Sequence, residues 1–87
     1  MKLVVVSPQN KHEYSVQWME AHTPSGSLYI KPGHAPLIIT LLAGTDFSFL
    51  LSTDEKKIIR LIRPGFLKVA RDGAMAIIGQ DPSTGSG

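Results

Sequence analysis

Short runs of Val, Ile, Leu and Phe recur along the chain, separated by turn residues about every eight to twelve positions. This spacing is typical of a β-sandwich or barrel, and no stretch shows the repeat of an amphipathic helix. We therefore expect an all-β fold, a two-sheet antiparallel β-sandwich. The expected strands cover residues 2–7, 14–18, 28–31, 37–42, 46–52, 57–63, 65–70 and 74–78.

Two runs depart from simple alternation. Tyr14, Val16 and Trp18 alternate cleanly, but the next apolar residues shift phase to Met19 and Ala21, which indicates a β-bulge or a change of sheet near Trp18. Residues 37–42 are apolar almost throughout, which fits either one turn of helix or a strand buried on both faces. Their β-branched residues favour the strand.

Turn signals support the hairpins of this scheme. Residues 8–10 and 53–55 are turn candidates, and Asp72-Gly73 is the strongest short hairpin signal in the chain. In residues 46–52, Phe47, Phe49 and Leu51 share one face.

Composition limits the function. The chain has 87 residues, 43% apolar and 18% charged, which suits one folded domain, expected over residues 1–80 with a flexible tail at 81–87 that is either natural or a cloning remnant. A net charge of +2 with scattered basic residues does not favour nucleic acid. Without cysteine there is no disulfide or thiolate metal site. The apolar runs fall short of a membrane span and no export signal is visible, so we expect a cytoplasmic, monomeric domain.

Reactive groups are few. His12, His22 and His34 match no metal-ligand spacing, so we expect no metal and no cofactor. Asp54 and Glu55 lie in a predicted turn, and an enzyme using His34 with one of them has no support beyond the presence of these residues. We expect no catalytic residue.

The only basic cluster lies in the strand expected over residues 57–63. Lys57 and Arg63 would share one face of this strand, and Lys56 and Arg60 the other. Such charges either discourage edge pairing or face an acidic protein partner.

The most specific segment is residues 26–37. Pro32 fixes one backbone angle and Gly33 permits a positive one, so the chain can reverse sharply and hold His34 at the tip of a rigid turn. The segment resembles the Gly-Glu-Phe/Leu-Gly-Ile-x-Pro-Gly-His-Ala-Pro-Leu signature of the epsilon subunit of rotary ATP synthases (delta in mitochondria). Matching residues are Ile30, Pro32, Gly33, His34, Ala35, Pro36 and Leu37, and residues 64–69 resemble the family's Gly-Gly-Phe-Leu-Glu-Val strand.

Departures accompany the matches. Ser27 stands where the family usually has glutamate, Tyr29 where it has glycine and Pro64 where it has the first glycine of the pair. Family members continue into a C-terminal helical hairpin that regulates ATP hydrolysis and in some members binds ATP. This hairpin is missing here, so we expect neither that inhibition nor a nucleotide site.

The resemblance implies a non-catalytic subunit at the foot of the central stalk, on the cytoplasmic face of the energy-transducing membrane. Its partners would be the gamma subunit and the rotor ring, and it would couple ion transport to ATP synthesis. Expected gamma contacts are Pro32, Gly33, His34, Ala35 and Pro36; expected ring contacts are Ser25, Gly26 and Ser27. Trp18 either joins the gamma contact or packs in the core. The alternative is a stand-alone β-sandwich adaptor with another partner.

Overall fold

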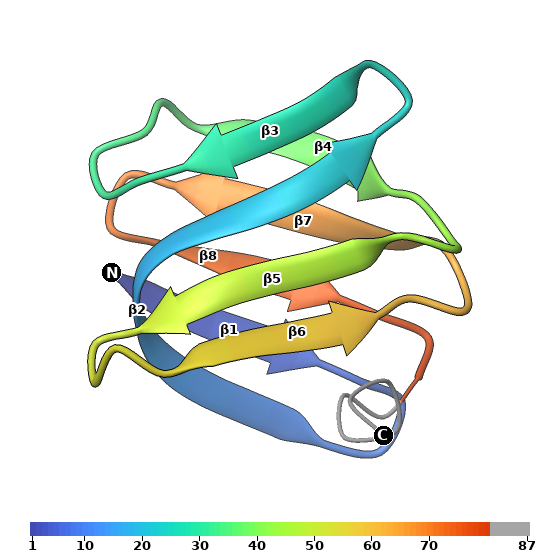
Figure 1. The fold of residues 1–87 in the computed structure, drawn as a ribbon, viewed down its shortest axis with the longest axis horizontal. Helices are drawn as coiled ribbons and strands as arrows, with labels where there is room; N and C mark the ends of the chain where they lie inside the picture. The colour runs from blue at the N-terminus through green and yellow to red at the C-terminus, as the bar shows by residue number, and fades with distance from the viewer. Residues whose placement is uncertain (81–87) are drawn as a thin grey trace.

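The computed structural model describes residues 1–80, in which seven of the eight strands pair into one continuous path, β3 pairs with β2 beside it, and the strands form two layers (Figure 1). The strands are β1 (Lys2–Val6), β2 (Lys11–Thr23), β3 (Gly26–Ile30), β4 (Leu37–Leu41), β5 (Asp46–Leu51), β6 (Lys56–Arg60), β7 (Gly65–Ala70) and β8 (Gly73–Ile77). The described residues contain no helix, and hence none that could cross a membrane. The all-β prediction is confirmed, and the tail predicted at 81–87 lies outside the described residues.

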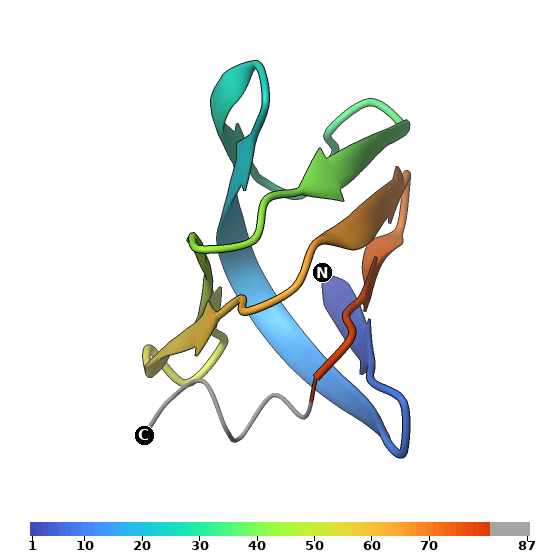
Figure 2. The same ribbon diagram turned by 90° about the vertical axis from the view of Figure 1, so that its right-hand side faces the viewer.

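Each layer is a sheet, and β2 belongs to both. Sheet A has the order β4-β7-β8-β1 and ends on the first half of β2, whereas sheet B has the order β3-β2-β5-β6. Figure 2 shows the layers from the side, with the long β2 crossing between them. The two-sheet sandwich predicted from the sequence is therefore present.

The crossing coincides with the predicted bulge. Along β2 and β5, Val16 lies opposite Leu51 and Trp18 opposite Leu50, so Gln17 is the extra residue of a β-bulge. Before the bulge Val16 points into the core, and after it Met19 does. The phase shift read from the sequence is confirmed as both a bulge and a sheet switch.

One strand pair departs from the antiparallel prediction. β1 and β8 run parallel, with Leu3 opposite Ala74 and Val5 opposite Ala76, while every other ladder among residues 1–80 is antiparallel. Parallel neighbours need a long connection, and here the strands between them provide it. Such a pairing joins the two ends of the domain, so local sequence patterns do not reveal it.

The core fills the space between the sheets. Phe47 and Phe49 are its largest members, with ring centroids 5.6 Å apart. Leu51 packs against the core from the same face, as the alternation predicts. The other buried apolar residues are Leu3, Val5, Val16, Met19, Ala21, Ile30, Leu41, Ile59, Leu61, Leu67, Val69, Ala74, Ala76 and Ile78.

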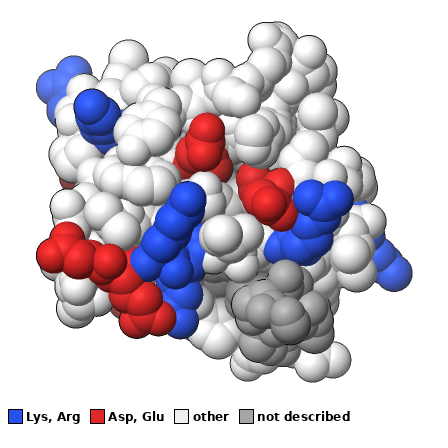
Figure 3. Space-filling model, viewed as in Figure 1, with Lys and Arg blue, Asp and Glu red and all other residues white. Residues whose placement is uncertain are grey.

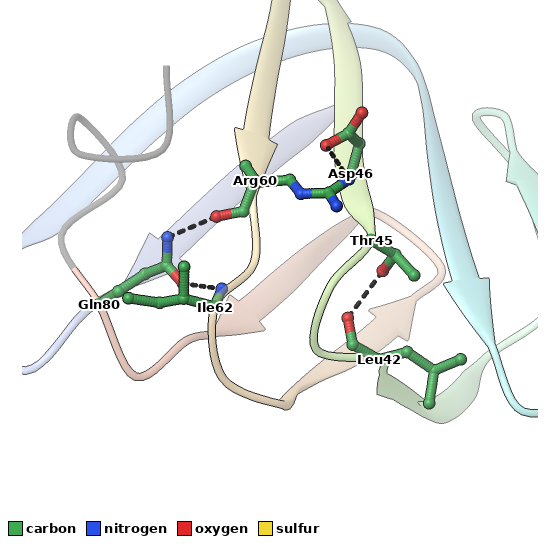
Figure 4. A network of polar contacts seen from close by, with 6 residues as sticks. All are labelled: Leu42, Thr45, Asp46, Arg60, Ile62 and Gln80. Atoms are coloured by element: carbon green, nitrogen blue, oxygen red, sulfur yellow. Dashed lines mark hydrogen bonds and ion pairs between the residues drawn. The ribbon is translucent and has the colours of Figure 1, made fainter. Parts of the chain in front are cut away.

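The strand predicted over residues 57–63 is shorter than expected. β6 ends at Arg60, so the prediction that Lys57 and Arg63 share a strand face is wrong, whereas Lys56 and Arg60 do share one. Beyond Arg60 the chain is held by the Gln80 side chain instead of a neighbouring strand. The Gln80 Oε1 accepts from the Ile62 N–H at 2.6 Å, and its Nε2 donates to the Arg60 carbonyl at 2.6 Å (Figure 4).

Candidate protein-interaction site

The turn that carries His34 connects β3 to β4. The His34 N–H donates to the Lys31 carbonyl at 3.2 Å, and Gly33 has a φ of 84°, so residues 31–34 form a turn that needs glycine at its third position. Pro32 and Gly33 are exposed and His34 is half-buried. The rigid turn expected from the Pro-Gly pair is present.

Within this turn, the imidazole has one nitrogen engaged. The His34 Nδ1 lies 2.7 Å from the Ala35 carbonyl oxygen. Because a carbonyl can only accept, Nδ1 carries the proton, and in the neutral ring Nε2 is left with an acceptor lone pair. The ring can therefore accept one hydrogen bond from a donor on a partner.

The second predicted contact loop is the β2–β3 turn. The Thr23 Oγ1 accepts from the Ser25 N–H at 3.1 Å and donates to the Gly26 carbonyl at 2.9 Å, which closes the turn. Ser25, Gly26 and Ser27 are all exposed. The Ser27 hydroxyl is 3.0 Å from the His22 Nδ1.

The two predicted contact loops do not meet. They lie at opposite ends of β3, whose five residues span about 16 Å. In Figure 1 the two loops are at opposite ends of the β3 arrow. One small surface therefore cannot cover both loops.

A larger feature that the sequence reading missed is the outer face of sheet A. Its most exposed large apolar side chains are Ile38 at 70%, Phe66 at 55% and Ile77 at 48%. They lie on adjacent strands, since Phe66 is opposite Ile77 and β4 borders β7. Four of the seven large exposed apolar side chains of the described residues are on this face: Ile38, Phe66, Met75 and Ile77.

This face, which we call the apolar face, corrects one prediction. Residues 37–42 were expected to be buried on both sides, but Leu37 and Ile39 point inward and Ile38 outward. The sequence feature that could have revealed the apolar face is the set of apolar residues at outward-facing positions of β4, β7 and β8. Exposed apolar side chains grouped on one face of a sheet in this way are typical of a protein-binding surface.

The outer face of sheet A also carries charged side chains beside the apolar ones. Lys68 projects between Ile38 and Met75, and beside it lies a groove with a volume of about 320 Å³. The groove is lined by Lys2, Val4, Lys68, Ala70, Asp72, Gly73, Ala74 and Met75.

Trp18 lies outside the core, on the outer face of sheet B. It is half-buried and stacks on Tyr29 with ring centroids 4.9 Å apart. The alternative in which Trp18 packs between the sheets is therefore wrong.

The groups considered for catalysis are not brought together. His34 bonds within its own turn, and the Asp54 carboxylate accepts from Gln17 Nε2 at 2.6 Å. Among residues 1–80, no hydrogen bond or ion pair joins His34 to a carboxylate, and no cluster of three or more His, Asp or Glu side chains could hold a metal.

Comparisons with known proteins agree with this architecture. Residues 1–78 match the family model described as ATP synthase, Delta/Epsilon chain, beta-sandwich domain. A curated relative, the ATP synthase epsilon chain of Bdellovibrio bacteriovorus, is 36% identical over 75 residues, or 84% of this chain. The match covers 53% of that relative, so the chain spans about half its length.

Solved structures share the fold at low sequence identity. A chain from the Tetrahymena thermophila mitochondrial ATP synthase central stalk and c-ring structure has a TM-score of 0.75 at 13% identity, covering 92% of this chain and 63% of that one. A chain of the Euglena gracilis mitochondrial ATP synthase has a TM-score of 0.76 at 13% identity, covering 90% and 49%. On the family match over residues 1–78, the chain belongs to the ATP synthase delta/epsilon family and forms its β-sandwich domain.

Proposed function

We propose that this chain is a non-catalytic part of the central stalk of a rotary ATP synthase, on the cytoplasmic face of the membrane. It binds the gamma subunit through the His34 turn and the apolar face, and the rotor ring through Ser25, Gly26 and Ser27. It thereby couples ion transport to ATP synthesis as a mechanical link. Family membership and the stalk structures among its structural neighbours support this role.

The observation that carries the proposal is the continuity of the turn with the apolar face. His34 and Ile38 are four residues apart, and the turn enters β4 directly. Pro36 is exposed between them and lacks an N–H, so it adds no unpaired donor of its own when this edge is covered. One partner surface can therefore cover the imidazole edge and the apolar side chains together.

Titration calorimetry with the cognate gamma subunit tests the proposal. Ile38→Ser and His34→Ala should each weaken binding about tenfold or more, because central apolar and hydrogen-bonding contacts carry most interface energy. Ile58→Ser is the matched control, since Ile58 is 44% exposed on the outer face of sheet B. It should bind as the wild type does.

The alternative is a stand-alone adaptor with the same fold. It is favoured by Ser27 and Tyr29, which replace residues usual in the family. A folded chain with no measurable affinity for gamma would refute the stalk proposal and favour the adaptor. Equal loss of binding in Ile38→Ser and Ile58→Ser would refute the assignment of the surface.

A further inference from the structure

The outer face of sheet B carries an aromatic pair flanked by two lysines. Trp18 and Tyr29 stack with an interplanar angle of 27°. The Lys31 Nζ lies over the Tyr29 ring, 5.6 Å from its centroid, and the Lys56 Nζ lies over the Trp18 ring at 5.8 Å. We call these four residues, Lys31, Tyr29, Trp18 and Lys56, the aromatic ladder.

Strand register assembles the ladder. Met19 lies opposite Ile30, which places Trp18 opposite Lys31, and Leu50 lies between Trp18 and Lys56. The row therefore runs from Lys31, directly after the end of β3, across β2 and β5 to Lys56 in β6, and Tyr29 lies in the next row. In Figure 3, which looks onto this face, blue basic and red acidic side chains both border the white area.

The exposed part of the ladder is electropositive. The edges of aromatic rings carry partial positive charge, and the two ammonium groups add full charges. Within residues 1–80, Lys2, Lys57 and Arg60 each have a carboxylate partner, whereas no ion pair involves Lys31 or Lys56. These two lysines contact the rings and keep hydrogen-bonding capacity for an added acceptor.

The acidic residues of the same face do not cancel this charge. Asp46 is occupied by Arg60 at 3.3 Å. Glu20 lies in the neighbouring row, opposite Tyr29, and forms no ion pair with Lys31. An acidic ligand is therefore directed to Lys31 and Lys56 at the two ends of the ladder, because Tyr29 lies opposite Glu20.

We infer that the aromatic ladder is a docking site for an acidic segment of a protein partner, in which carboxylates flank an apolar side chain. The carboxylates bind Lys31 and Lys56, and the apolar side chain covers the ring edges and Leu50. The ladder lies on the opposite layer from the apolar face, so this inference does not depend on binding to gamma. A nucleic acid fits less well because the rings already cover one another and have lysines over them, which leaves little ring face for base stacking.

Trp18 makes the test direct because it is the single tryptophan of the chain. A short synthetic peptide in which Glu and Leu alternate is titrated into the wild-type protein at low salt, and Trp18 emission is recorded. We expect a saturable change that a peptide of alternating Lys and Leu does not produce. Absence of saturation, or the same change with the basic peptide, would overturn the inference.

Two double variants with the same change in net charge distinguish binding at the ladder from general electrostatic attraction. Lys31→Glu with Lys56→Glu should weaken peptide binding at least tenfold, whereas Lys11→Glu with Arg71→Glu, which changes net charge equally at exposed positions elsewhere, should weaken it less than threefold. Equal losses would show unspecific electrostatic binding and sink the proposal. Tighter binding of single-stranded oligothymidylate than of the acidic peptide would also overturn it. Both variants should keep the wild-type circular dichroism spectrum, since all four side chains are exposed.

Discussion

Replacing Gln80 by alanine should destabilise the domain although the residue follows the last strand. Gln80 is 6% exposed, and its amide bonds two main-chain groups where β6 ends. On the other side of this segment, the Leu61 N–H donates to the Thr45 carbonyl at 2.9 Å, and the Thr45 hydroxyl bonds the Leu42 carbonyl (Figure 4). The chain after β6 is thus held between a loop and one side chain.

The expected loss follows from the groups left behind. In Gln80→Ala the Ile62 N–H and the Arg60 carbonyl lose their partners, and a buried unpaired polar group costs about 1–3 kcal/mol. Because the Ile62 side chain is 67% exposed, water reaches part of this corner, and we expect a total loss of about 2 kcal/mol. A domain of this size has a free energy of unfolding of about 4–12 kcal/mol, so the loss is a large fraction.

Urea unfolding followed by circular dichroism measures this loss. With an m-value of about 1–2 kcal/mol/M, the midpoint should fall by about 1–2 M at unchanged m. Gln9→Ala is the matched control, because Gln9 is exposed in the β1–β2 turn, and it should change stability by less than about 0.5 kcal/mol. Equal midpoints for Gln80→Ala and the wild type would refute the argument that this side chain replaces a missing strand.

Three further substitutions each test one feature of the backbone, and urea unfolding measures the change in stability for each. Gly65→Ala should cost at least about 2 kcal/mol, since an added Cβ would lie 2.5 Å from the Ile77 carbonyl oxygen; a neutral result would mean that β7 and β8 can separate freely. In Gly33→Ala the added Cβ meets open space, but residue 33 has a φ of 84°, which strains an alanine. We expect a loss of stability of only about 1 kcal/mol, and a larger loss would contradict this reasoning. Asp54→Gly relieves a φ of 70° but loses the Gln17 hydrogen bond, so stability should change by less than about 1 kcal/mol; a larger loss would show that the hydrogen bond dominates.

The sequence pattern predicts the strands well where alternation and turn residues agree. β5 and β7 are found nearly to the residue because each has one apolar face and a turn signal at each end. β2 is longer than predicted at both ends, because Lys11 to Glu13 carry no alternation signal and the phase shift at the bulge hides the continuation from Met19 to Thr23. The parallel pairing of β1 with β8 depends on contacts between the two ends of the domain, which no local pattern encodes.

The candidate site also has one part that the sequence predicts and one part that it does not. The His34 turn is predictable because Pro32 and Gly33 restrict the backbone locally. The apolar face is not, because Ile38 and Phe66 come from strands that are distant in the sequence, and an exposed isoleucine looks like a core residue until the strands are paired. Alternation gives the two faces of a strand but does not say which face a partner covers.

The bulge at Gln17 links the fold to the surface chemistry. Without the extra residue, the phase that buries Val16 would also turn Trp18 toward the core, and Met19 would point to solvent. The Gln17 side chain in turn donates to the Leu51 carbonyl at 3.0 Å and to Asp54, which fixes the β5–β6 turn that leads into Lys56. The same irregularity therefore carries β2 from one sheet to the other, exposes the Trp18 ring and positions the strand that brings Lys56 over it.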